Sequence, residues 1–168
     1  WGYTLEMNYK TDVFGEIKAG TIASAEALVY LPGIFRNHGI QIYAGIQSLT
    51  KKHMYYGTLL NYPRGYTGTI TSDATSASVN YRFPIAYPDF SLGSLLYLKR
   101  IRGTLFADHL STKSPILEEF NAAGYEVLFD SYWLRLVTPI SIGFRYVNIL
   151  KEAKERYEVL FSVNFDDI

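Results

Sequence analysis

A strict alternation of apolar and polar residues runs through most of this chain and constrains its fold more than any other feature. In the opening segment every second residue is large and apolar, namely Tyr3, Leu5, Met7 and Tyr9. The closing segment repeats the pattern with Tyr157, Val159, Phe161, Val163 and Phe165. A period of two places each set on one face of a β-strand. The pattern therefore predicts an all-β chain of amphipathic strands.

Eight segments carry this alternation. They are Gly2–Lys10, Thr21–Leu31, Gly39–Leu49, Ala77–Ile85, Leu95–His109, Tyr125–Leu136, Pro139–Ile149 and Arg156–Asp166. Most are about 10 residues long, the length that a tilted strand needs to cross a bilayer. Strands of globular proteins are shorter, commonly about 5–6 residues. The lengths favour an antiparallel transmembrane β-barrel, with residues 1–168 as one barrel region and no soluble accessory domain.

The connections between these segments alternate in length. Tight turns are expected at 32–38, 86–89 and 138–139, and longer loops at 50–76 and 110–124. The charged segment Lys151–Arg156 is expected to lie in water, as a turn or a short helix. Short turns at one end of the strands and longer loops at the other are typical of outer-membrane barrels.

Composition narrows the classes of function. Aromatic residues make up 16% of the chain, led by 15 Tyr, whose amphipathic ring suits the boundary between lipid and water. Lys plus Arg and Asp plus Glu both number 16, and this balance argues against a nucleic-acid partner. No apolar run approaches the roughly 20 residues of a transmembrane helix. No signal-peptide pattern precedes the first strand, so an exported chain is expected to be processed or part of a longer one.

Catalytic and metal-binding motifs are not found in the sequence. It has no Gly-rich phosphate loop, no His-Glu-x-x-His and no nucleophile elbow. Cysteine is absent, and His38, His53 and His109 lack the spacing of metal ligands. We therefore expect no enzymatic activity, no cofactor and no metal site.

The polar face of the predicted strands carries both signs of charge. In a barrel the lumen-facing set would be Glu6, Lys10, Glu26, Arg82, Arg100, Arg102, Asp108, Glu126 and Asp130. Side chains of opposite charge would form ion pairs across such a lumen, whereas a soluble sandwich would turn the same face to solvent. The pentapeptide Tyr125–Phe129 also recurs as Tyr157–Phe161. In a meander these two strands run in the same direction, and identical facing requirements would produce the match.

Three sequence elements occur in a recognisable order. Tyr62-Pro63-Arg64-Gly65-Tyr66 lies in a long loop, Asn80–Ile85 follows as an aromatic strand with a Pro, and Arg102–Asp108 ends in Phe-Ala-Asp. Together they resemble the BamA-like superfamily of outer-membrane insertases and two-partner-secretion transporters (the bacterial surface antigen barrel). The chain departs from that pattern at Pro63, where an aliphatic residue is usual, and at Leu110, where Gly is frequent.

The resemblance implies a specific contact inside the barrel. The loop folds back into the lumen, where Arg64 forms a charge-assisted bond with Asp108. Gly65 permits the tight loop tip that precedes Tyr66, and Phe106 shares the inward face with Asp108. The eight strands would match the C-terminal half of a sixteen-stranded barrel. The last strand would form one side of a seam, through Tyr157, Val159, Phe161 and Phe165.

The function implied is assembly of outer-membrane proteins, or protein translocation, in the bacterial outer membrane. The expected partners are the lipid bilayer, outer-membrane protein substrates and periplasmic or lipoprotein accessory subunits. Two alternatives remain open on the residues alone. One is a self-contained eight-stranded outer-membrane barrel with a structural or adhesive role. The other is a soluble lipocalin-like barrel that binds an apolar ligand.

Overall fold

In the computed structural model of the chain, nine β-strands form one antiparallel sheet. The structure describes residues 2–11, 21–50, 59–67, 72–113, 118–134, 136 and 138–163, and these contain no helix. The strands are β1 (Gly2–Thr11), β2 (Thr21–Pro32), β3 (Gly39–Leu49), β4 (Ala74–Ala86), β5 (Phe90–Leu92), β6 (Leu96–Thr112), β7 (Glu119–Trp133), β8 (Ile140–Ile149) and β9 (Lys154–Val163). The prediction of an all-β antiparallel chain is confirmed.

Each of the eight predicted segments forms a strand, and each pairs with its neighbours in chain order. The order across the sheet is β1-β2-β3-β4-β6-β7-β8-β9, and the short β5 pairs only with β6. The central strands are longer than predicted, with 17 residues in β6 and 15 in β7. The charged segment after β8 is a turn at 150–153 that leads directly into β9.

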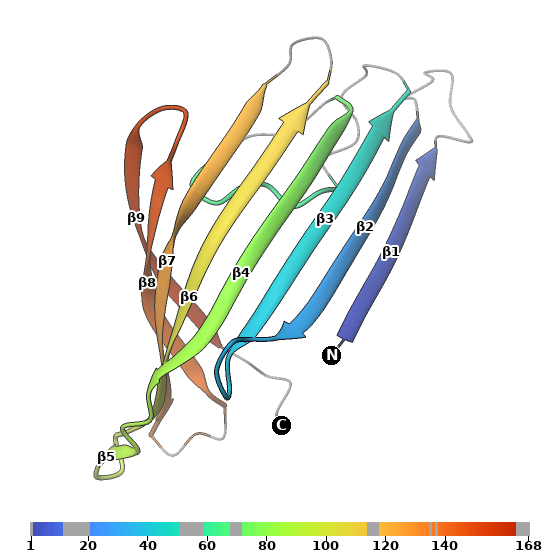
Figure 1. Cartoon of the computed structure of the whole chain (residues 1–168). Coiled ribbons are helices and arrows are strands. Elements are labelled where there is room, and N and C mark those ends of the chain that lie inside the picture. The colour runs from blue at the N-terminus through green and yellow to red at the C-terminus, as the bar shows by residue number, and fades with distance from the viewer. Residues whose placement is uncertain are drawn as a thin grey trace.

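The sheet is curved but does not close into a barrel, because its path ends at β1 on one side and β9 on the other (Figure 1). Both closed alternatives, the eight-stranded membrane barrel and the lipocalin-like barrel, are therefore not what the described residues form. An eight-stranded barrel encloses little more space than its own side chains fill. Here the backbone of residues 59–67 lies against strands from β3 to β8. If the eight long strands closed into a barrel, the interior would have no room for this segment.

The two faces of the sheet differ in what covers them. We call the face that carries residues 59–67 the inner face, and the opposite one the outer face (Figure 1). Two small apolar clusters lie under residues 59–67, one around Leu60 and Leu110 and one around Phe106 and Val147. The outer face instead leaves apolar side chains exposed, among them Tyr3, Leu5, Met7, Ile46, Val79, Leu105, Phe144, Val159 and Phe161. Alternation thus sorts the side chains as the sequence predicted, although some of the inward ones are apolar.

Short connections lie at one end of the strands, at 33–38, 87–89 and 134–139. Figure 1 shows them below the sheet, together with β5. We call this the short-turn end. The turn at 33–38 is closed by backbone hydrogen bonds, one of them from Gly33 N to His38 O at 2.9 Å. Within the described residues, no helix has the length and apolar character to span a membrane.

Candidate functional site

Residues 59–67 are fastened to the inner face by backbone and side-chain hydrogen bonds. Leu59 N donates to Gln47 Oε1 at 2.9 Å, which ties the segment to β3. Asn61 N donates to the Tyr43 hydroxyl at 3.1 Å, and that hydroxyl donates in turn to Glu26 Oε2 at 2.8 Å. These contacts give the backbone N–H groups of Leu59 and Asn61 hydrogen-bond partners on the sheet. The segment therefore has a defined position against the sheet.

The tip of the segment is a tight turn whose geometry requires glycine. Tyr66 N donates to Pro63 O at 3.3 Å, and Gly65 has φ +80°. A Cβ added at Gly65 would lie 2.8 Å from Val147 Cγ1, which is closer than a real contact allows. Gly65 is thus needed twice, for its left-handed backbone and for its close approach to β8.

The ion pair expected between Arg64 and Asp108 is present. Arg64 Nε lies 3.0 Å from Asp108 Oδ2, and Arg64 Nη2 donates to Oδ1 at 3.2 Å. The backbone N of Arg64 also donates to Oδ2, at 3.1 Å. Only 6% of the Asp108 side chain is exposed. A carboxylate that is both buried and held at three points is a strong, directional attachment for the loop.

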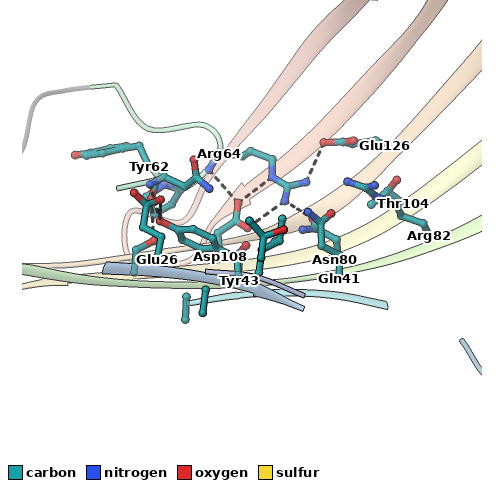
Figure 2. A pocket seen from close by; sticks show the side chains of 18 of the residues that line it. Glu26, Gln41, Tyr43, Tyr62, Arg64, Asn80, Arg82, Thr104, Asp108 and Glu126 are labelled. Carbon is teal, nitrogen blue, oxygen red and sulfur yellow. Dashed lines mark hydrogen bonds and ion pairs between the residues drawn. The ribbon is translucent and has the colours of Figure 1, made fainter. Parts of the chain in front are cut away.

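Arg64 has further partners on three strands. Its Nη1 lies 3.0 Å from Glu126 Oε1 on β7, and its Nη2 donates to Asn80 Oδ1 on β4. The guanidinium carbon sits 3.9 Å from the centroid of the Phe106 ring on β6. Figure 2 shows the guanidinium between these polar groups, with its hydrogen bonds drawn as dashed lines. Phe106 and Asp108 lie on the same face, as their spacing of two predicts.

The ring of Phe106 fits there because the neighbouring strand is bare at Gly124. A Cβ on Gly124 would lie 2.8 Å from Phe106 Cζ and 1.9 Å from the Tyr146 carbonyl oxygen. Glycine in a strand marks close approach of another group. This position supports the stacking of Arg64 on Phe106, a contact of cation–π geometry.

The contacts of Arg64 continue into a longer ion-pair network. Arg145 on β8 places its Nε 2.6 Å from Glu126 Oε1 and its Nη1 2.7 Å from Glu158 Oε2 on β9. Charges therefore alternate in sign from Asp108 through Arg64, Glu126 and Arg145 to Glu158. We call this series the central network. It links the loop with the four strands β6 to β9.

Tyr66 and Tyr62 pack the loop against β7. The rings of Tyr66 and Phe120 are 5.2 Å apart in edge-to-face contact, and the Tyr66 hydroxyl donates to Asn121 O at 3.3 Å. Tyr62 meets the same Phe120 ring at 5.7 Å. Burial, and secondarily the negative charge of Glu118, raises the pKa of Tyr62 above its usual value of 10.0. The phenol therefore stays neutral and packs as an aromatic group.

The predicted inward charges form two groups on the inner face. Glu6, Glu26, Arg82, Asp108 and Glu126 line a cavity of about 620 Å³ under the loop. Arg100 and Arg102 instead meet Asp130 nearer the short-turn end. Lys10 pairs with Ile22 in the β1–β2 register and makes no ion pair within the described ranges.

The predicted seam residues lie apart from the loop. Tyr157, Val159 and Phe161 are exposed on the outer face of β9, which is an edge of the sheet. Phe165 lies outside the described residues. These side chains do not touch Arg64 or its partners in the part of the chain that the structure describes.

Several residues of the site were not predicted as partners of the loop. Glu126 was expected to face inward, but its bond to Arg64 was not expected, and Asn80, Tyr43 and Arg145 were not singled out. The repeat of Tyr125–Phe129 at Tyr157–Phe161 was the one feature of the sequence that could have indicated ion-pair partners for Arg145. It puts Glu126 and Glu158 at equivalent positions on the two strands that flank β8.

Comparison of the chain with models of protein families, with curated proteins and with solved structures gives no match.

Proposed function

We propose that this chain is part of a transmembrane β-barrel of the BamA-like type, the C-terminal half of a sixteen-stranded barrel in the bacterial outer membrane. In this proposal it serves the assembly or translocation of other proteins. The observation that carries it is the fold-back of the loop onto the inner face, where Arg64 binds Asp108 at 3.0 Å. This is the contact that the resemblance implies.

The division of the two faces supports the membrane part of the proposal. Along β1 the side chains of Tyr3, Met7 and Tyr9 are each more than two thirds exposed, at 86%, 73% and 69%. Soluble monomers rarely expose contiguous apolar patches of more than a few hundred Å². A bilayer would cover such a surface, while the charged inner face would stay in water. The same charged lining does not suit the apolar ligand of a lipocalin-like protein.

The proposed mechanism involves no covalent chemistry. The central network holds the loop inside the barrel, so that the loop braces the wall from β3 to β8. The edge of β9 presents unpaired backbone groups, and such an edge can add a strand from another chain. A substrate strand would be templated there before its release into the membrane. Periplasmic or lipoprotein subunits would deliver the substrate.

Membrane residence is tested by expressing the chain within its natural reading frame in a Gram-negative host and washing the membranes with urea. We expect the protein to stay in the membrane pellet until detergent is added. Recovery in the soluble fraction without detergent would overturn the membrane proposal.

The assembly role is tested by complementation, after depletion of the natural gene. Arg64→Asp is expected to lower the amounts of other outer-membrane proteins, and the double variant Arg64→Asp/Asp108→Arg to restore them in part. Lys151→Glu, in an exposed turn, serves as the charge-change control. Normal levels of outer-membrane proteins after depletion itself would refute the role.

A further inference from the structure

Three arginines line one small cavity on the inner face toward the short-turn end, and the first of them, Arg82, also lines the cavity under the loop. Arg82 lies on β4, and Arg100 and Arg102 lie on β6. The side chains of Arg100 and Arg102 are 46% and 41% exposed, whereas that of Arg64 is 20% exposed. We call them the terminal arginines. They do not touch the central network and have no role in the function proposed above.

Two of the terminal arginines, Arg100 and Arg102, share a single carboxylate. Asp130 on β7 accepts from Arg100 Nε and, at 3.2 Å, from Arg102 Nε, and it also accepts from Ser141 Oγ at 2.7 Å. Each guanidinium has five N–H donors, so one bond through Nε leaves the outer N–H groups available. Arg82 has no ion-pair or hydrogen-bond partner among the described residues.

The local charge is therefore unbalanced. The small cavity is lined by three arginines and no acidic residue, with Asp130 bound to two of the arginines, so positive charge is in excess there by two. On its other side Arg82 borders the larger cavity that Glu6, Glu26, Asp108 and Glu126 line. Arg36 directly precedes Asn37, which lines the cavity among the terminal arginines, and adds a further positive charge in the neighbouring turn. The chain as a whole has a net charge of zero, so this surplus is a local feature.

A small cavity opens among the terminal arginines. Its volume is about 180 Å³, and it is lined by all three arginines and by the apolar residues Phe83, Pro84 and Tyr87. Strand irregularities lie on both sides of it, between Pro84 and Ala86 in β4 and between Leu98 and Arg100 in β6. Bulges of this kind redirect side chains and are frequent beside functional sites.

We propose that the terminal arginines bind carboxylate side chains of an acidic polypeptide segment. Asp130 provides the template, because it shows that a carboxylate fits between two of these guanidinium groups. The apolar walls suit the methylene groups of Glu or Asp, which a free inorganic anion lacks. The volume admits a side chain and excludes a helix, whose diameter is about 10–12 Å. The proposed site does not depend on the assembly role, because it is inferred only from the residues that line this cavity.

The test uses a fluorescent peptide of six glutamates, with a six-glutamine peptide as its neutral match. Binding to the purified chain in detergent micelles is followed by anisotropy at several salt concentrations. We expect the glutamate peptide to bind and the glutamine peptide not to bind. Affinity should fall as salt rises, because the attraction is electrostatic.

Variants locate the site. Arg82→Gln removes an exposed arginine that has no partner among the described residues, so the fold should persist. We expect a loss of affinity of about tenfold, the equivalent of about 1.4 kcal/mol, and a partial recovery in Arg82→Lys. Lys151→Gln removes one positive charge at the opposite end of the strands and should leave affinity unchanged. Circular dichroism checks the fold of each variant.

Three results would overturn the proposal. Equal binding of the glutamine peptide would remove the charge basis. Unchanged affinity in Arg82→Gln, or an equal loss in Lys151→Gln, would place binding elsewhere. Competition by inorganic phosphate at concentrations as low as those of the peptide would show a general anion site in place of a polypeptide site.

Discussion

The central network and the terminal arginines use the same residue type on the same face in different ways. Around Arg64 and Arg145, three carboxylates meet two guanidinium groups, and the arginine side chains are 20% and 23% exposed. At the short-turn end Arg100 and Arg102 share only Asp130 and are both more than 40% exposed, and Arg82 has no partner among the described residues. Half-buried arginines whose donors are occupied by carboxylates hold the loop in place. Unsaturated, exposed ones retain donors for a further anion.

Removal of Asp108 should have the largest effect of the changes considered. In Asp108→Ala the side chain and backbone N of Arg64 lose the carboxylate that binds them at three points, while Glu126 remains, so the expected loss is about 1.5–3 kcal/mol, as for hydrogen bonds to a charged group. Denaturant unfolding in detergent micelles, followed by tryptophan fluorescence, would measure the loss. Glu152→Ala, at an exposed turn, is the control and should leave unfolding unchanged. A similar loss in both variants would contradict the special role of the central network.

The loop tip gives the next largest effect, and the chain provides a matched pair of glycines. Gly65 and Gly93 both have positive φ, but a Cβ on Gly93 meets nothing within 4 Å. Gly93→Ala should cost about 1–2 kcal/mol for the left-handed backbone alone. Gly65→Ala should cost more, because the new methyl group also collides with Val147. Equal losses in the unfolding free energy would show that the tip does not sit against β8.

The terminal arginines should matter less for stability. Arg100→Ala and Arg102→Ala should each cost less than about 1 kcal/mol, because exposed ion pairs contribute little. The double variant should cost more than the sum, because Asp130 then stays buried without a cation. A double-mutant cycle on unfolding free energies measures this coupling. Additive losses would mean that Asp130 does not depend on either arginine.

Removal of the exposed ion pair between Lys154 and Glu152 should have the smallest effect on stability of the changes considered. The hydrogen bond from Lys154 lowers the pKa of Glu152. A lowered folded-state pKa gives stability that is present above the unfolded value and is lost as pH falls. In Lys154→Ala the pKa of Glu152, measured by NMR titration, should rise toward its usual value. The unfolding midpoint at neutral pH should not change, and a clear shift would contradict this ranking.

Alternation predicted which side chains share a face, because a period of two is a property of a single strand. It did not reveal register, which depends on two strands together. The meeting of Arg64 with Asp108 was expected from the resemblance alone, and the addition of Glu126 followed only from the β6–β7 register. The segment 119–124 was predicted as loop and forms the start of β7. Its Ala122-Ala123-Gly124 stretch lacks large apolar residues, and at Gly124 an added Cβ would meet the Phe106 ring and the Tyr146 carbonyl oxygen.

The three-residue strand β5 was also missed. Phe90–Leu92 pairs with Leu96–Leu98 across a tight turn that contains Gly93 at φ +57°. A strand of this length shows no measurable alternation, so its sequence reads as part of a connection. Its pairing depends on β6, which extends beyond its pairing with β4 at the short-turn end and there takes β5 as its second neighbour.

The position of Arg145 between two glutamates affects how accurately the sheet assembles. A strand that slips by two residues keeps its faces correct, so burial alone does not reject that error. In the native register Arg145 lies opposite Glu126 on one side and Glu158 on the other. A slip of β8 by two residues would place Gly143 or Val147 between those glutamates, and both ion pairs would be lost together. Arg145 thus fixes the register of β8 against both β7 and β9. The pentapeptide that these two strands share would by itself permit several registers.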